Sequence, residues 1–123
     1  MLTVMIVDDS LIIRKKLNKM LIELNCTVVA QAINGREAIK LYKQYNPDFV
    51  TMDITMPLMD GINATKKITE EFPNANIIMI TSHGQEDMVK NAIKCGAKGY
   101  ILKPLTREKL LTSMNKVFYI ENE

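Results

Sequence analysis

Five short apolar runs alternate with longer segments of helical periodicity, and this alternation restricts the fold more than any other feature of the sequence. The runs cover residues 3–7, 28–32, 49–52, 77–80 and 100–102. They are almost continuously apolar, as is typical of strands that are covered on both faces. Strands that are separated by helices connect through right-handed crossovers into a parallel sheet. The sequence therefore predicts an α/β fold with a doubly wound, five-stranded parallel sheet.

Three of the intervening segments carry an apolar stripe with a period of 3.6 residues. The stripes consist of Ile13, Leu17, Met20, Leu21 and Leu24; of Ala38, Leu41, Tyr42 and Tyr45; and of Leu110, Leu111, Met114, Val117 and Phe118. Ser10 and Thr106 are predicted to be N-caps, and Asn34 with Glu37 has the pattern of a capping pair. These signals indicate where three of the helices lie and which side of each helix is buried.

The composition is that of an ordinary globular chain. Its 123 residues suit a single domain, residues 1–123, whose core needs no disulfide or structural metal. The net charge of +2 is too small to indicate nucleic-acid binding, and Lys90, Lys94 and Lys98 are expected to form a solvated helix face. Cys26 and Cys95 lack metal-ligand or redox spacing and are expected to be reduced thiols. No signal peptide or membrane-spanning run is visible, so we expect a cytoplasmic protein.

Four of the five runs end in polar, reactive side chains. These are Asp8 and Asp9 after the first run, Asp53 after the third, Thr81 and Ser82 after the fourth, and Lys103 after the fifth. In an open parallel sheet, ligands bind beyond the carboxyl ends of the strands. A strand order of 2-1-3-4-5, which we borrow from flavodoxin-like folds, would place the first and third strands side by side. The three carboxylates would then share one pocket.

Three carboxylates in one pocket repel one another. Two unit charges about 4 Å apart cost roughly 4 kcal/mol at an effective dielectric constant near 20, so the pocket must retain protons or hold a cation. Oxygen ligands with few protein donors suit Mg²⁺, which often partners phosphate. Lys103 adds a balancing ammonium, Thr81 offers a hydroxyl donor, and Asp53 can act as a carboxylate nucleophile. We therefore expect a magnesium-dependent site for a phosphoryl group.

Each of these strand-end residues also has an ordinary structural explanation when it is considered alone. Asp8 and Asp9 could open a helix, and Asp53 could be a capping residue. Only the joint placement of the residues at one edge of the sheet indicates a functional site. His83, the single histidine of the chain, is expected to be an exposed loop residue instead of a catalytic base.

The stretches IVDDS, NGREAI, DFVTMDITMPLMDGI, IIMITS and GAKGYILKP resemble, in order and spacing, the receiver domain of two-component response regulators. The resemblance covers essentially the whole chain. It extends in particular to stand-alone chemotaxis regulators of the CheY type, through the MDITMP segment. It implies a phosphoacceptor switch that assists its own phosphorylation and dephosphorylation, and not an enzyme with a separate substrate.

The resemblance also implies roles for the acidic residues. Asp53 would be the phosphoacceptor, and it would also contribute to the Mg²⁺ site. Asp9 would bind Mg²⁺ directly, Asp8 would act mainly through metal-bound water, and Thr55 would lend its backbone carbonyl to the metal. These assignments are expectations for the site that the strand ends suggest.

On the same basis, Lys103 would pair with the phosphoryl group, and its bond to Pro104 would be cis. Thr81 and Tyr100 would form the switch pair. Their shift would be read on the face made by the fourth helix, the fifth strand and the fifth helix. Thr55 and His83 occupy positions that are expected to tune the lifetime of the phosphoryl group.

The expected partners are a histidine kinase of the CheA type and a protein target such as a flagellar motor switch protein. The target would meet a surface that includes Tyr100, Lys90, Lys94 and parts of the last helix. We expect a bacterial protein that is monomeric, and the charge and the lack of a long apolar run indicate that it binds no nucleic acid and does not insert into membranes.

Three alternatives remain open at this point. The chain could be the receiver of a larger regulator, for example one that binds DNA, although it ends in VFYIENE directly after the last helix. An aspartyl-phosphate phosphatase of the haloacid-dehalogenase type would need a general acid where Thr55 stands, and it would leave Asp8 and Asp9 unexplained. A flavodoxin-like flavin binder would lack its Ser/Thr-rich phosphate loop, because acids follow the first strand.

Overall fold

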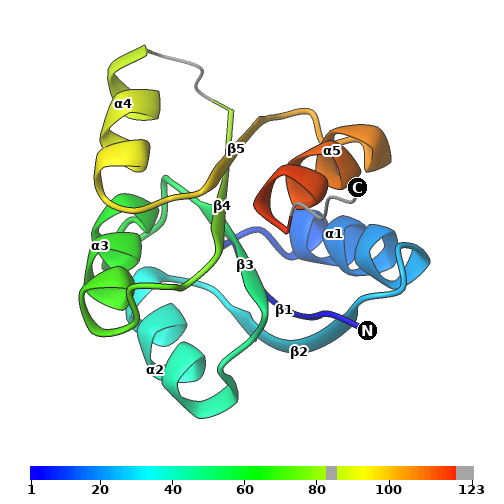
Figure 1. Cartoon of the computed structure of the whole chain (residues 1–123), viewed down its shortest axis with the longest axis horizontal. Helices are drawn as coiled ribbons and strands as arrows, with labels where there is room; N and C mark the ends of the chain where they lie inside the picture. The colour runs from blue at the N-terminus through cyan, green and yellow to red at the C-terminus, as the bar shows by residue number, and fades with distance from the viewer. Residues whose placement is uncertain (83–85, 119–123) are drawn as a thin grey trace.

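The computed structural model describes residues 1–82 and 86–118, in which strands and helices alternate strictly (Figure 1). The strands are β1 (Thr3–Val7), β2 (Thr27–Ala32), β3 (Phe49–Asp53), β4 (Ile77–Thr81) and β5 (Gly99–Leu102). The helices are α1 (Leu11–Glu23), α2 (Gly35–Tyr45), α3 (Gly61–Glu71), α4 (Glu86–Lys94) and α5 (Arg107–Val117). Each predicted strand agrees with the observed one to within one residue at either end. Among the described residues, no helix is long and apolar enough to cross a membrane.

The five strands form one parallel sheet in the order β2-β1-β3-β4-β5, which confirms the predicted fold. This order makes β1 and β3 neighbours in the centre of the sheet. Their register pairs Val7 with Met52, so the next residues, Asp8 and Asp53, lie at the same level. The sheet therefore brings together two carboxylates that are far apart in the sequence.

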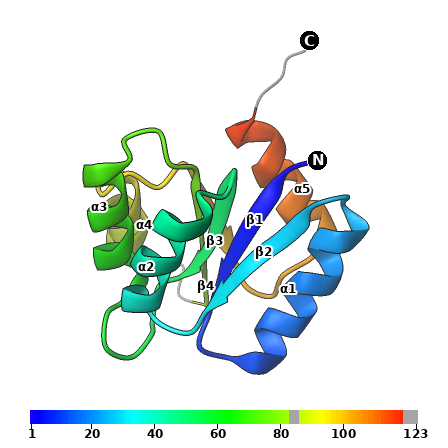
Figure 2. The ribbon, with the colours of Figure 1, turned by 90° about the horizontal axis from the view of Figure 1, so that it is seen from below.

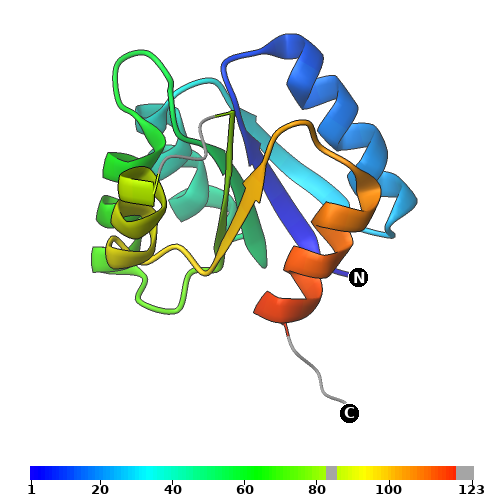
Figure 3. The same ribbon diagram turned by 90° about the horizontal axis from the view of Figure 1, so that it is seen from above.

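Helices cover both faces of the sheet, with α1 and α5 on one face and α2, α3 and α4 on the other (Figure 2, Figure 3). Successive side chains of a strand point to opposite faces, and β1 supplies both layers. Met5 and Val7 belong to the core beneath α2, α3 and α4, whereas Val4 and Ile6 belong to the core beneath α1 and α5. Burial on both faces explains why the strands are almost continuously apolar.

The predicted helix caps are confirmed. Ser10, Asn34 and Thr106 cap α1, α2 and α5, and each side-chain oxygen accepts a hydrogen bond from the backbone N–H three residues further on. The carboxylate of Glu37 in turn accepts a hydrogen bond of 3.0 Å from the backbone N–H of Ile33. The caps fix the directions in which these helices leave the carboxyl edge of the sheet.

Two apolar stripes are narrower than predicted. Tyr45 and Leu111 are exposed, with 45% and 43% of their surface accessible, because each lies at the margin of the stripe that its helix turns towards the core. Lys98 was expected to share a helix face with Lys90 and Lys94, and this is wrong. The helix α4 ends at Lys94, and the ammonium of Lys98 donates to Oδ1 of Asn76 at 3.0 Å.

The sequence shows no apolar stripe for the helix α3, which Asp60 caps at its amino end. Its buried positions are Gly61, Ala64, Thr65 and Ile68, of which only Ile68 is a large apolar residue. Small and hydroxyl side chains let the helix lie close to the sheet, but they give a weak hydrophobic period. The packing of α3 is therefore visible only in three dimensions.

Candidate functional site

Three carboxylates meet at the carboxyl edge of the sheet, as the strand ends predicted. Asp8 and Asp53 are buried, with 2% and 8% of their surface accessible, and Asp9 is exposed. One carboxylate oxygen from each of the three residues lies within 4.8 Å of the others. The pocket is thus open to solvent on the side of Asp9 and closed on the side of the sheet.

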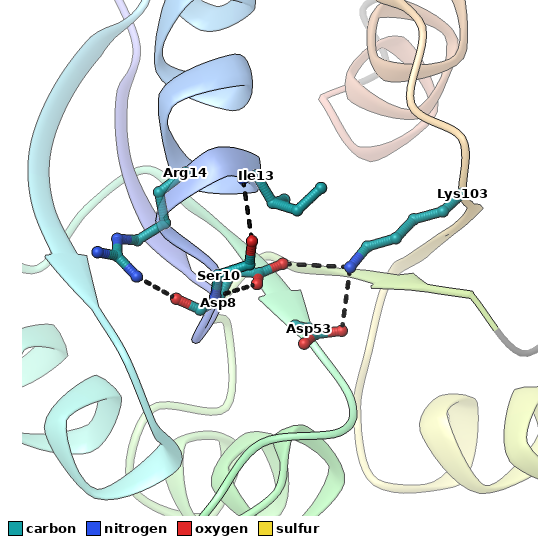
Figure 4. A network of polar contacts seen from close by, with 6 residues as sticks. All are labelled: Asp8, Ser10, Ile13, Arg14, Asp53 and Lys103. Atoms are coloured by element: carbon teal, nitrogen blue, oxygen red, sulfur yellow. Dashed lines mark hydrogen bonds and ion pairs between the residues drawn. The ribbon is translucent and has the colours of Figure 1, made fainter.

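Lys103 extends from the end of β5 to this cluster and ends between the two buried carboxylates (Figure 4). Its Nζ lies 3.3 Å from Oδ2 of Asp8 and 3.6 Å from Oδ1 of Asp53. One ammonium balances only one of the three carboxylates. The cluster retains an excess of negative charge, and its donors are all hard oxygen atoms, so the residues fit a divalent cation such as Mg²⁺.

The environment of Asp53 favours its protonated form. Burial is the largest cause and the neighbouring charge of Asp8 the second, and together with the other contacts they raise the pKa of Asp53 to about 6. The ammonium of Lys103 lowers the pKa of Asp53, and Asp9 has the opposite influence. A bound cation would favour the ionised carboxylate, which is the form that can act as a nucleophile.

Backbone contacts fix the orientation of Asp8. Its Oδ1 accepts a hydrogen bond of 2.9 Å from the backbone N–H of Ser10, the residue that caps α1. Its carbonyl oxygen accepts one of 2.8 Å from the guanidinium of Arg14 (Figure 4). Sequence reasoning missed Arg14, because nothing in the spacing shows that an arginine one turn into α1 reaches back to Asp8.

The loop from β3 to α3 packs directly against the backbone of Asp53. The N–H of Gly61 donates to the carbonyl of Ile54 at 2.8 Å. A Cβ atom on Gly61 would clash with the carbonyl oxygen of Asp53, so no other residue fits here without moving the loop. Thr55 lies in this loop, and its side chain is exposed.

The two residues of the expected switch pair lie on neighbouring strands. Thr81 is buried at the end of β4, and its carbonyl accepts a hydrogen bond of 2.7 Å from the N–H of Lys103. Tyr100, on β5, is half-buried and packs against the core beneath α2, α3 and α4. The peptide between Lys103 and Pro104 is cis, as expected. His83 lies outside the described residues.

A cavity of about 660 Å³ opens on the face formed by α4, β5 and α5. Its lining includes Ile93, Lys98, Tyr100, Leu102, Glu108, Lys109, Thr112 and Lys116. Tyr100 and α5 therefore line the surface that was expected to meet a protein target. Lys90 and Lys94 are exposed on α4 but are absent from this lining, and Lys94 instead borders a groove between α3 and α4.

Comparison with known proteins gives consistent results for sequence and structure. Residues 4–115 match the family described as response regulator receiver domain. The chain is 46% identical to the chemotaxis protein CheY of Thermotoga maritima, over 93% of this chain and 95% of that protein. It is 45% identical to the CheY of Bacillus subtilis, over 92% and 94%.

Among solved structures, the CheY of a CheX-CheY-BeF3-Mg+2 complex from Borrelia burgdorferi superposes with a TM-score of 0.93 at 41% identity. That match covers 97% of this chain and 90% of the other. The response regulator domain of Thermotoga maritima CheB superposes with a TM-score of 0.89 at 29% identity, and the match covers 98% of both chains.

Proposed function

The chain belongs to the family of response regulator receiver domains, and on this basis we propose that it is a phosphorylation switch whose phosphoacceptor is Asp53. The fold and the relatives identify it as a receiver domain of the CheY type, from two-component signalling. We further propose that the phosphoryl group comes from a histidine kinase of the CheA type. The chain would assist its own phosphorylation and dephosphorylation, without acting on a separate substrate.

The observation that carries this proposal is the position of the Lys103 ammonium between Asp8 and Asp53. An ammonium so close to the acceptor carboxylate is ready to pair with a phosphoryl oxygen on Asp53. A carboxylate oxygen of Asp53 would attack phosphorus as the bond to the donor nitrogen breaks, which gives an aspartyl phosphate. Lys103 and the hydroxyl of Thr81 would donate hydrogen bonds to the transferred group.

Asp8, Asp9 and Asp53 would hold one Mg²⁺, together with the backbone carbonyl of Thr55. The close approach of the three carboxylates supports this assignment. When bound, Mg²⁺ would neutralise the carboxylates and orient the phosphoryl oxygens. Asp9 would bind it directly, whereas Asp8 is held by Ser10 and Lys103 and would act mainly through metal-bound water.

Phosphorylation of Asp53 would alter the surface formed by α4, β5 and α5. Thr81 would move towards the phosphoryl group and leave space for the ring of Tyr100. Couplings of this kind are typically about 1–3 kcal/mol, or about 5- to 150-fold in affinity. The cavity beside Tyr100 supports a protein target on this face. A flagellar motor switch protein is the proposed target, since the relatives are chemotaxis proteins.

The similarity to CheY proteins over most of their length supports a stand-alone regulator more than a receiver attached to a DNA-binding domain. We propose that residues 1–123 form this single receiver domain. The free thiols of Cys26 and Cys95 support the expected cytoplasmic location. The phosphatase alternative lacks its general acid at Thr55 and leaves the pair Asp8 and Asp9 unexplained, and the flavin-binding alternative lacks its phosphate loop after the first strand.

Incubation with acetyl phosphate and Mg²⁺ tests the proposal. We expect one phosphoryl adduct by intact-mass spectrometry, which hydroxylamine removes because it is an acyl phosphate. The adduct should be lost when EDTA replaces Mg²⁺, and it should be absent from Asp53→Asn. An adduct that resists hydroxylamine, or that persists in this variant, contradicts the proposal.

A further inference from the structure

Lys109, in the first turn of α5, reaches back to the loop that carries Lys103. Its Nζ donates to the carbonyl of Leu102 at 3.1 Å and to the carbonyl of Pro104 at 3.0 Å. These two carbonyls lie on either side of Lys103. One side chain therefore fixes the backbone before and after the lysine of the site.

Other contacts complete this anchoring. The N–H of Lys103 donates to the carbonyl of Thr81 at 2.7 Å, and Leu105 is buried in the core beneath α1 and α5. The backbone of Lys103 is thus held by β4, by the core and by Lys109. From this position its side chain places the ammonium 3.3 Å from Asp8 and 3.6 Å from Asp53.

Helix stability does not explain a lysine at position 109. Thr106 is the N-cap of α5, so Lys109 is the third helical residue, where Glu or Gln completes a capping box. The amino end of a helix carries partial positive charge and disfavours a cation. The favourable contacts of this ammonium are those with the carbonyls of Leu102 and Pro104.

We propose that Lys109 is a positioning residue, which holds the backbone on both sides of Lys103 and so keeps the Lys103 ammonium between Asp8 and Asp53. Lys109 also lines the cavity on the face formed by α4, β5 and α5. Its side chain therefore lies between the proposed target surface and the proposed phosphoryl site. The consequences for phosphoryl transfer rest on the proposed phosphoacceptor role of Asp53, whereas those for metal binding rest only on the proposed Mg²⁺ site.

Metal affinity tests the positioning without any phosphoryl chemistry. In Lys109→Met the Lys103 ammonium is held less firmly, so it competes less with Mg²⁺ for the carboxylates. We expect an NMR titration at high salt to show Mg²⁺ binding about fivefold more tightly. This difference is about the size of one ordinary hydrogen bond. Lys109→Arg retains donors for both carbonyls and should restore the parental affinity.

Lys116→Met is the matched control, because Lys116 lines the same cavity and its loss changes the net charge equally. We expect this variant to bind Mg²⁺ as the parent does. If it binds as tightly as Lys109→Met, the effect comes from the lost charge and the positioning role is wrong. High salt screens such long-range charge effects.

A double-mutant cycle separates positioning from general stability. Lys109→Met acts through Lys103, so it should leave the Mg²⁺ affinity of Lys103→Met unchanged. It should also slow the labelling of the parent by acetyl phosphate about fivefold, again as for one hydrogen bond. A disturbed pocket would instead weaken metal binding and labelling together. Weaker metal binding together with slower labelling would overturn the inference. An equal effect of Lys109→Met on Mg²⁺ affinity in the parent and in Lys103→Met would also overturn it.

The two proposals fail in distinguishable ways. If the parent takes up no phosphoryl group, the proposed function fails, and the Mg²⁺ cycle still decides the role of Lys109. If the parent is labelled on Asp53 but Lys109→Met binds Mg²⁺ as the parent does, only the role of Lys109 is wrong.

Discussion

The ammonium of Lys103 lies 3.3 Å from the carboxylate of Asp8, although 95 residues separate them in the sequence. The contact arises because β1 and β3 are neighbours and β5 lies two strands beyond β3 in the same parallel sheet. All three strands deliver their last residues to one edge. The site is therefore a consequence of strand order.

Loss of Asp9 should weaken metal binding at the carboxylate cluster. Asp9 is the exposed member of the three-carboxylate cluster, and Mg²⁺ retains several waters, so an accessible carboxylate suits it as a direct ligand. We expect an NMR titration to show that Asp9→Ala binds Mg²⁺ at least about tenfold more weakly than the parent. A loss of this size is typical for the removal of a charged contact. Glu23→Ala, which removes a carboxylate at the far end of α1, is the control. Parental affinity in Asp9→Ala would show that the metal assignment is wrong.

Stability of the metal-free protein should fall as the pH rises through about 6. The pKa of Asp53 is raised to about 6 in the folded state, so folding favours the protonated carboxyl. The contribution of the Asp53 carboxyl to stability is complete below its pKa in the unfolded chain. It is lost as the pH rises through its pKa in the folded protein. Asp53→Asn should therefore be more stable than the parent at pH 7 by about 1–2 kcal/mol, and nearly equal to it at pH 4.

Urea denaturation at both pH values measures this difference, and saturating Mg²⁺ should reduce it, because the cation stabilises the ionised carboxylate. Equal stabilities of the parent and Asp53→Asn at pH 7 without metal would contradict the account of Asp53.

Thr51→Val should stabilise the fold. The hydroxyl of Thr51 is buried in β3 and has no hydrogen-bond partner in the described part of the chain. A methyl group in its place has the same shape and removes the unsatisfied polar group. The free energy of unfolding should therefore rise by about 1 kcal/mol. Thr65→Val is the matched control, because the buried Thr65 hydroxyl contacts the sulfur of Met79 at 3.5 Å. A loss of stability in Thr51→Val, measured in urea, would show that the hydroxyl is satisfied.

A substitution of Thr81 should affect the structural response to phosphorylation more than the phosphorylation of Asp53 itself. Thr81→Ala leaves Asp8, Asp53 and Lys103 in place, so acetyl phosphate should still label Asp53 to a similar final extent, although more slowly because one donor to the transferred group is lost. The change in the amide resonances of β5 on phosphorylation should shrink, because Tyr100 no longer responds to Thr81. A response in Thr81→Ala as large as that of the parent would show that the switch runs through other residues.

The sequence was sufficient to predict the strands and the polar edge of the sheet, because both are local patterns. Apolar runs marked the strands to within one residue, and Asp8, Asp53 and Lys103 follow directly from where those runs end. The strand order was borrowed from known folds. Local pattern cannot rank the pairings of five similar strands, and only the register of Val7 with Met52 establishes which carboxylates meet.

The residues that support the site could not be predicted. Arg14 and Lys109 act on backbone carbonyls of Asp8, Leu102 and Pro104, and no motif records a contact to a carbonyl. Lys98 has helical spacing with Lys94 but follows the end of α4, because the spacing of charges alone does not define where a helix stops. Such features depend on tertiary packing, which leaves no periodic signal in the sequence.

The central claim is that Asp53 carries the phosphoryl group, and chemical mapping of the adduct tests it most directly. The protein is labelled with acetyl phosphate and Mg²⁺, reduced with borohydride and digested, and the peptides are sequenced by mass spectrometry. Reduction converts an aspartyl phosphate to homoserine, and we predict homoserine at position 53 alone. Homoserine at position 8 or 9, or a phosphoryl group retained on a serine, threonine or histidine, would contradict the account.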